Sequence, residues 1–240
     1  MNALGPALVA VSGDLTQRAR RSQFAEARAW LASLTAPSLV VPGNHDIPLY
    51  DLVRRIMSPR VRYRHYVTRD LEPWFADDAL AVAGIDTTKA FTTQFGRITE
   101  EQAQRAALRF DENPRDWRVL VAHHPLIAPE GFEHERASGS DAALPILERA
   151  GLDVILTGHL HRAHSEGAVG RNTSHTMIAV HAGTCMSTRL RGEPNGYNVV
   201  RFEDDAVMVT HREWNGHAFA DRARKSYRRA PSGERVVKVA

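Results

Sequence analysis

The stretch DVILTGHLH, residues 153–161, places His159 and His161 two residues apart directly after a short apolar run. A run of this length and composition predicts a buried strand. Two imidazoles beside a buried strand need hydrogen-bonding partners or ligands, because burying a polar group without a partner costs free energy. The stretch therefore predicts a polar site at the end of a core strand, and other parts of the chain are expected to complete it.

Three other apolar runs also end in unusual polar clusters. In open α/β sheets, the loops beyond the carboxyl ends of the strands bind ligands, so clusters in this position are expected to face one crevice. Their shared position carries more weight than any single motif. The clusters are VSGDLT (residues 11–16), VPGNHD (residues 41–46) and VAHHPL (residues 121–126).

Each cluster taken alone also has a purely structural interpretation. Gly13 and Asp14 can form an ordinary strand-to-helix turn, in which the carboxylate accepts backbone hydrogen bonds. Asp46 can cap a helix that begins at Pro48, and the two histidines of the third cluster can simply end a strand. The joint occurrence of four clusters favours a functional site over four unrelated turns.

The residue types in the clusters are those that hold transition metals. A carboxylate, an amide oxygen and imidazoles, without a thiolate, suit Mn, Fe, Zn or Co better than Ca. Asp14 has two oxygens and can bridge two ions, while Asn44 supplies a neutral oxygen. His159 and His161 can each reach a different ion of a pair separated by ~3.5 to 4 Å. The two imidazoles are therefore best explained as one ligand for each of two metals.

Length and composition predict one domain with few classes of partner. The 240 residues, 43% of them apolar, suffice for a substantial core. The balance of 31 basic and 28 acidic residues leaves a net charge of +3, too small for a surface that coats nucleic acid. Cys185 is the only cysteine, which excludes a disulfide within the chain. No apolar span or signal pattern occurs, so we expect no membrane partner and a cytoplasmic location. Residues 1–216 are expected to form the domain and residues 217–240 a basic, solvated tail.

Apolar runs alternate with helical patterns up to residue 157, and strands alone follow. The segments HTMIAVHAG, GYNVVRFED and AVMVTHREW predict consecutive strands joined by turns. This order predicts two packed sheets flanked by helices, an α/β (α+β) architecture. Earlier strands are predicted at 7–11, 38–41, 80–86, 118–122 and 153–157, with helices at about 24–34, from 48, at 99–110 and at 140–150.

At these motifs the sequence resembles the calcineurin-like metallophosphoesterase superfamily, and more closely its bacterial cyclic-nucleotide phosphodiesterase-like branch. The resemblance implies a four-layer α/β/β/α sandwich and a binuclear site for two divalent or mixed-valence ions of Mn, Fe or Zn. It also implies hydrolysis of a phosphodiester or phosphomonoester. The matching elements, in family order over most of the chain, are GD (residues 13–14), GNHD (43–46), HHP (123–125) and GHLH (158–161).

The resemblance assigns a role to each metal ligand. Asp14 bridges the two ions. Asn44, His123 and His159 bind the first of these ions together with Asp14. His161 binds the other ion. The first ion thus has four protein ligands, a plausible complete set.

One family motif is missing from this chain. An Asp-x-His at the end of the first strand supplies two further ligands in the family, but residues 1–13 contain neither Asp nor His. We therefore expect the first strand to be absent and the second metal site, left with Asp14 and His161, to be weak. A start codon assigned downstream of the true one, a truncation, or a loss of hydrolysis would each account for this.

We expect a metallophosphoesterase in which a metal-bound hydroxide attacks phosphorus. His45 would stabilise the transition state or protonate the leaving oxygen. The expected substrate is a small phosphoester, with a 3',5'-cyclic nucleotide among the candidates. A nuclease of the same superfamily and a catalytically inactive binding module are the alternatives. Weaker candidates are Arg189 and Arg191 for holding phosphate, and His124 and His181 for supporting the ligands.

Overall fold

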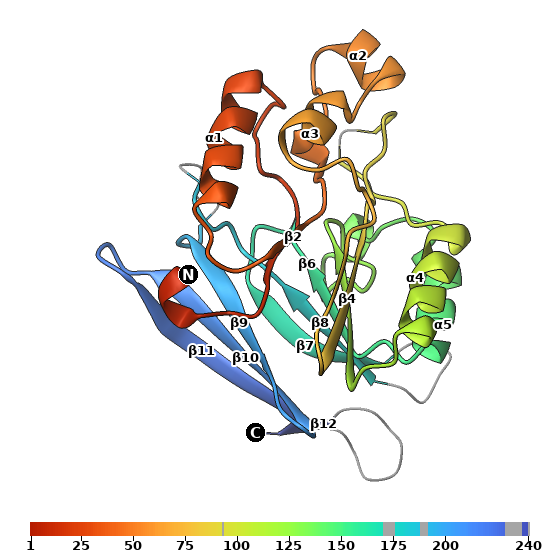
Figure 1. Cartoon of the computed structure of the whole chain (residues 1–240), viewed down its shortest axis with the longest axis vertical. Helices are drawn as coiled ribbons and strands as arrows, with labels where there is room; N and C mark the ends of the chain where they lie inside the picture. Colours follow the sequence, from red (N-terminus) through yellow and green to blue (C-terminus); the bar gives the residue numbers. More distant parts are fainter. Residues whose placement is uncertain (93, 170–175, 188–191, 229–236, 240) are drawn as a thin grey trace.

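A six-stranded and a four-stranded β-sheet pack face to face, α-helices cover the larger sheet, and a further two-stranded sheet holds the first part of the chain (Figure 1). The structure is a computed structural model that describes residues 1–92, 94–169, 176–187, 192–228 and 237–239. The α/β sandwich expected from the sequence is confirmed. No helix among the residues that the structure describes is long and apolar enough to cross a membrane.

The larger sheet has six strands in the order β3-β4-β5-β6-β8-β7. Its centre is parallel, whereas β3 and β7 pair antiparallel at the two edges. The central strands are apolar on both faces, as expected where both faces are covered. The strands are β3 (Trp74–Ala76), β4 (Leu80–Ile85), β5 (Trp117–Ala122), β6 (Val154–Thr157), β7 (His164–Val169) and β8 (Thr176–His181).

Strand β5 shows how the two faces differ. Leu120 and Ala122 pack toward helices α4 (Glu100–Glu112) and α5 (Ser140–Arg149). Val119 and Val121 point the other way, into the core between the two sheets. This alternation follows from the two-residue period of a strand.

Helices α4 and α5 lie side by side on the outer face of the six-stranded sheet (Figure 1). Thr99 caps α4 together with Gln102, which confirms the capping box expected from the sequence. Phe110 of α4 and Leu147 of α5 are fully buried against the sheet. These two helices therefore fix the position of the strands that carry the site.

The smaller sheet has four strands in the order β12-β11-β10-β9. Val207 and Val209 of β10 and Tyr227 of β11 close the core between the sheets. None of the core residues between the sheets comes from a helix, and no helix of the described ranges covers the outer face of this sheet in Figure 1. The expected four-layer sandwich has an outer helical layer on each sheet. The described residues form no such layer on the smaller sheet. Its strands are β9 (Gly196–Phe202), β10 (Ala206–Trp214), β11 (Phe219–Arg228) and β12 (Val237–Val239).

The segment after residue 216 differs from the solvated tail suggested by its charge. Strand β11 pairs along its whole length with β10, from Phe219 opposite Trp214 to Arg228 opposite Ala206. Six of the ten β11 residues are exposed and four are basic, so the strand lacks the apolar pattern on which a sequence-based prediction relies. Pairing with an already buried strand supplies the stability that the β11 side chains do not.

The first part of the chain forms a separate two-stranded parallel sheet of β1 (Val9–Val11) and β2 (Ser38–Val40). A short 3₁₀ helix, η1 (Asn2–Leu4), precedes β1. Helices α1 (Arg21–Ala32) and α3 (Val61–Tyr66) cover β2, with Phe24 and Tyr63 buried beside Val40.

The helix expected from Pro48 begins later and is not buried. Helix α2 (Leu52–Met57) starts after Asp51, whose carboxylate accepts a hydrogen bond from the Arg54 amide. The Pro48 carbonyl instead accepts a hydrogen bond from the guanidinium of Arg55. The expected apolar face is exposed, with Val53 at 74% of its full exposure. Periodicity therefore predicted a helix correctly but predicted the wrong environment for it.

Candidate metal centre

The four polar clusters meet at one place. The imidazole Nε2 of His123, after β5, lies 2.9 Å from Asn44 Oδ1 and 3.5 Å from Asp14 Oδ1. The same nitrogen lies 3.3 Å from Nδ1 of His159, after β6. Ligands of one tetrahedral ion at bonds of 2.0–2.2 Å stand roughly 3.4 Å apart. His123 Nε2 thus lies at about the spacing of two ligands of one ion from an atom of each of the other three side chains, and the donor types suit a transition metal.

Strain in the backbone concentrates at these residues. Among the described non-glycine residues with positive φ are Asp14 (56°), His159 (69°) and His161 (56°). A left-handed backbone is uncommon for such residues and costs free energy, so surrounding packing must maintain it. It turns the side chains sharply out of the strand ends, where they face one another.

Two glycines allow the first and second clusters to approach. A Cβ at Gly13, whose φ is +88°, would lie 2.8 Å from Nδ1 of His123. A Cβ at Gly43 would lie only 2.1 Å from Asp14 Oδ1. Any larger residue at either position would therefore displace a candidate ligand.

His45, the candidate for transition-state stabilisation, lies next to the cluster in the 3₁₀ helix η2 (Asn44–Asp46). Its amide donates a hydrogen bond to Asp14 Oδ1 at 3.0 Å. Its ring Nδ1 lies 2.9 Å from the carbonyl oxygen of Gln17. A proton on Nδ1 bonded to this carbonyl fixes the ring, so that Nε2 is the nitrogen left for proton exchange.

Asp46 holds the first two clusters together and is completely buried. Its carboxylate accepts hydrogen bonds from the amides of Leu15, Thr16 and Gly43. Burial, and next the charge of Asp14, raise the pKa of Asp46 to about 7, against the effect of these donors. The residue ties the loop after β1 to the loop after β2 and so sets the position of Asp14.

His159 contacts a carboxylate that the sequence motifs do not contain. Its Nε2 lies 2.9 Å from Oε2 of Glu135, in the 3₁₀ helix η3 (Glu133–Glu135). Burial, and next the neighbouring His123, lower the pKa of His159 to about 4, so the ring is neutral at pH 7. Burial alone would raise the pKa of Glu135, but the hydrogen bond and charge of His159 bring it below its usual value.

His124 is a further member of the cluster. Its Nδ1 lies 2.8 Å from the hydroxyl of Thr87, and its Nε2 lies 3.1 Å from the carbonyl oxygen of Gln94. Burial, followed by the charges of His123 and His159, holds its pKa well below the usual value. The ring nitrogens of these three histidines lie within 4.8 Å of one another, a grouping that could hold a metal. His124 thus stands beside the ligands, and its supporting role stays a prediction.

His161 contacts a different side chain. Its Nδ1 is 3.2 Å from the hydroxyl of Thr184, and the three-histidine group does not include it. Its assignment to a second ion stays a prediction. His181 lies in β8 with Nδ1 2.7 Å from the hydroxyl of Thr157. Arg189 and Arg191 lie outside the described residues.

Sequence reasoning missed Glu135, Thr87 and Gln94. Glu135 belongs to a polar loop that also contains Glu130 and Glu133, and no spacing rule separates the three. Thr87 follows β4 directly, so the strand-end rule that found the other clusters had a signal there.

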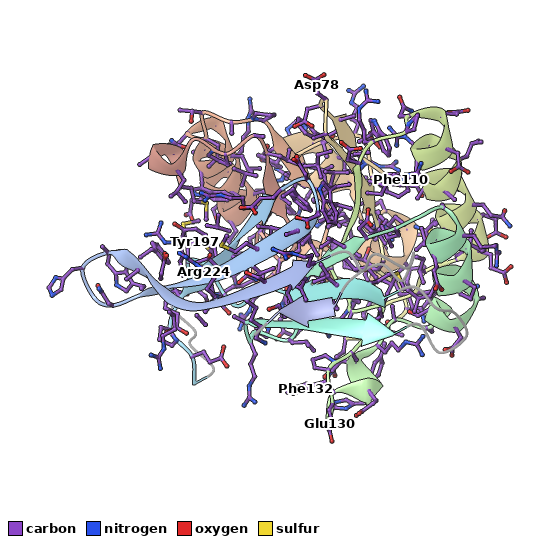
Figure 2. All side chains as sticks on the ribbon, turned by 90° about the horizontal axis from the view of Figure 1, so that it is seen from below. Asp78, Phe110, Glu130, Phe132, Tyr197 and Arg224 are labelled. Atoms are coloured by element: carbon purple, nitrogen blue, oxygen red, sulfur yellow. The ribbon has the colours of Figure 1, made fainter. Side chains whose placement is uncertain are left out.

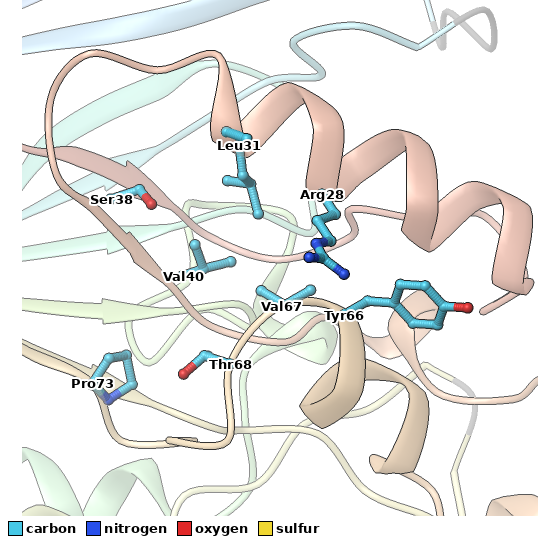
Figure 3. Close-up of a pocket in the computed structure, with 9 residues that line it drawn as sticks. Arg28, Leu31, Ser38, Val40, Tyr66, Val67, Thr68 and Pro73 are labelled. Atoms are coloured by element: carbon cyan, nitrogen blue, oxygen red, sulfur yellow. The ribbon is translucent and has the colours of Figure 1, made fainter.

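A cavity of about 300 Å³ lies elsewhere, between α1, β2 and the segment after α3 (Figure 3). Leu31, Val40 and Tyr66 are among the residues that line it, together with Arg28. It contains none of the candidate ligands. The cluster described above is therefore the candidate functional site.

The α/β sandwich and its carboxylate, amide and imidazole cluster define the class of metallophosphoesterase folds. The family model for calcineurin-like phosphoesterase matches residues 2–163. Since this match covers more than half of the chain, the chain belongs to the calcineurin-like phosphoesterase family.

Individual relatives are distant. A probable cyclic nucleotide phosphodiesterase of a Synechococcus species is 24% identical over 168 residues, which are 68% of this chain and 60% of that protein. The chain thus spans less than two thirds of the length of this curated relative. GAP50, the anchor in the inner membrane complex of Plasmodium, has a similar structure, with a TM-score of 0.58, 15% identity, and coverage of 92% of this chain and 79% of its own. The calcineurin-like phosphoesterase YfkN from Bacillus subtilis gives a TM-score of 0.46 at 12% identity, covering 91% and 75%. The similarity to GAP50 supports the fold alone.

Proposed function

We propose that the protein is a metal-dependent phosphoesterase that hydrolyses a small phosphodiester or phosphomonoester. The observation that carries the proposal is the convergence of Asp14, Asn44, His123 and His159 at the spacing of metal ligands. Family membership, which is associated with divalent metals and hydrolysis, supports the same activity. The distant cyclic nucleotide phosphodiesterase makes cyclic nucleotides the first substrates to test.

The residues present fit a transition-metal ion. Their donors are a carboxylate, an amide oxygen and imidazoles, the set that Mn, Fe and Zn accept. His159 presents a neutral ring at pH 7, so it needs to lose no proton before it binds a metal. When bound, such an ion polarises the phosphoryl group and lowers the pKa of its water.

The protein's own residues position and protonate the substrate in this proposal. Asp14 and Asn44 set the cluster at the carboxyl ends of β1 and β2, and His45 stands beside them. The Nδ1 contact with Gln17 orients the His45 ring, whose Nε2 can then deliver a proton to the leaving oxygen. Loss of such a general acid typically costs ~10² to 10⁴ in rate.

The test is hydrolysis of bis(p-nitrophenyl) phosphate by the purified chain with Mn²⁺, beside a His45→Ala variant and a chelated sample. We expect metal-dependent turnover that the variant loses. Cyclic nucleotides and p-nitrophenyl phosphate, a phosphomonoester, follow under the same conditions. Equal, metal-independent rates in all three samples would refute the proposal.

A second candidate is a binding module that retains one metal without turnover. One observation favours it: the three-histidine group that could hold a metal does not include His161, the ligand expected for a second ion. A protein that binds Mn²⁺ tightly, with a phosphate analogue, but hydrolyses none of these esters would support it.

A further inference from the structure

We propose that Glu135 is a positioning residue that fixes the His159 imidazole so that its Nδ1 faces the metal site. This inference rests on the proposed function, and it assigns a role to a residue outside the four motifs. The observation behind it is that the two nitrogens of His159 have different partners, Glu135 Oε2 at 2.9 Å and His123 Nε2 at 3.3 Å.

The contact is partly shielded from water. Only 8% of the His159 side chain and 14% of the Glu135 side chain are exposed. A carboxylate accepts hydrogen bonds and donates none when ionised, so the proton on the ring belongs on Nε2. Nδ1 then carries the lone pair, directed at His123 Nε2 and the candidate ligands around it.

Glu135 is itself held in place. Gln94 Nε2 donates a hydrogen bond to its other oxygen, Oε1, at 3.0 Å. The loop that carries it is also tied to the His159 loop, because the guanidinium of Arg162 lies 5.7 Å from the Phe132 ring centre. Figure 2 shows Phe132 and Glu130 at the projecting edge of the molecule, at the outer end of this loop. The carboxylate therefore stands on a segment anchored on both sides of the contact.

Such a carboxylate acts on metal affinity through the imidazole. Histidine ligands commonly donate their second N–H to a carboxylate, which fixes the tautomer and strengthens the ring as a donor. Removing the outer partner typically weakens metal binding or activity 10- to 100-fold. Glu135 also adds a negative charge beside a cluster that otherwise has Asp14 as its nearest carboxylate ligand.

The first experiment reads the tautomer directly in the chelated protein, by long-range ¹H–¹⁵N correlation of the histidine rings. A His159→Gln variant assigns the His159 signals. We expect the Nε2–H form in the wild type and a mixture of both tautomers in Glu135→Ala. An identical tautomer population in the two proteins would overturn the inference, whether or not the protein hydrolyses anything.

The second experiment measures Mn²⁺ affinity by calorimetric titration of wild type, Glu135→Ala, Glu135→Gln and the control Glu130→Ala. Glu130 is exposed on the same loop, so its variant reports any general effect of altering this segment. We expect a 10- to 100-fold weaker affinity in Glu135→Ala, a smaller loss in Glu135→Gln, which keeps an acceptor, and no change in the control.

The outcomes separate the two proposals. Turnover by the wild type with unchanged Mn²⁺ affinity in Glu135→Ala overturns the role of Glu135 alone. A wild type that neither binds Mn²⁺ nor hydrolyses an ester overturns the proposed function. In that case the tautomer comparison still decides whether Glu135 orients His159. Urea unfolding of the chelated variants verifies that each is folded.

Discussion

The imidazole of His159 is held between a carboxylate and a second imidazole, on a backbone of left-handed conformation. The left-handed backbone and the neighbouring imidazole each carry a free-energy cost in the metal-free protein, whereas the carboxylate holds the ring by a hydrogen bond. Burial makes the charged ring unfavourable, and its pKa falls to about 4. The residue that the motifs single out for metal binding is thus one that the fold keeps neutral at some expense.

This depressed pKa predicts a pH dependence of stability. Between about pH 6.5 and 4, the unfolded chain binds a proton on His159 and the folded chain does not, so stability falls as pH falls. Relative to His159→Gln, the chelated wild type should lose up to ~3 kcal/mol of unfolding free energy across this window. Urea unfolding at several pH values measures it. His217→Gln, at an exposed imidazole, is the control, and an equal pH slope in wild type and His159→Gln would contradict the expectation.

Gly43 predicts a steric effect at the same scale. In Gly43→Ala the new Cβ would meet Asp14 Oδ1 at 2.1 Å, so the carboxylate must move away from the cluster. We expect a loss of ~1–3 kcal/mol in stability, as for other overpacked sites, and weaker Mn²⁺ binding. Gly183→Ala serves as a control, because its new Cβ would meet the Ala163 amide nitrogen at 3.5 Å, an ordinary van der Waals contact. Equal urea midpoints and Mn²⁺ affinities in the two variants would speak against this account.

At the scale of helices and strands, two leucines on different helices differ sharply in burial. Leu147 of α5 is fully buried, whereas Leu52 of α2 retains 64% of its exposure. Leu147→Ala should therefore cost ~2–5 kcal/mol of unfolding free energy. Leu52→Ala should stay within ~0.5 kcal/mol. Denaturant unfolding of both variants compares them directly, and a large loss in Leu52→Ala would show that α2 is covered in solution.

The same pair marks how far the sequence predicts the structure. Strand-end reasoning anticipated that Asp14, Asn44, His123 and His159 lie close together, because β1 pairs parallel with β2 and β5 with β6, so that each pair has its carboxyl ends at one edge. Periodicity cannot tell whether an apolar helical face meets a core or solvent, as α2 demonstrates. Strand β11 was not predicted, because its exposed and basic residues do not show the alternation of apolar and polar residues that indicates a strand. Metal binding by the predicted ligands stays a prediction.

For the whole molecule, the candidate ligands come from segments between residues 14 and 159, so only the folded chain can assemble them. A metal that binds the folded state alone stabilises it by mass action, about 2.7 kcal/mol at 100 times its Kd. Mn²⁺ should then raise Tm by roughly 5–10 °C for a chain of this size, and a chelator should reverse the shift. Calorimetric or fluorescence melting measures it.

Two amide variants make this test specific. Asn44→Ala removes a candidate ligand oxygen and should abolish most of the Mn²⁺-dependent rise in Tm. Gln104→Ala, at an exposed amide on α4, should keep the full rise. A rise of the same size in both proteins would mean that the metal binds somewhere other than the cluster.

The short parallel pairing of β1 and β2 determines how precisely the first two candidate ligands are placed relative to each other. Three paired positions, Val9 with Ser38, Ala10 with Leu39 and Val11 with Val40, fix how far the loop of Asp14 reaches relative to the loop of Asn44. A slip of one residue would shift the two loops by about 3.3 Å and reverse the faces of the strand. That displacement exceeds the length of a metal–ligand bond. The three paired positions of β1 and β2 therefore fix the position of Asp14 relative to Asn44.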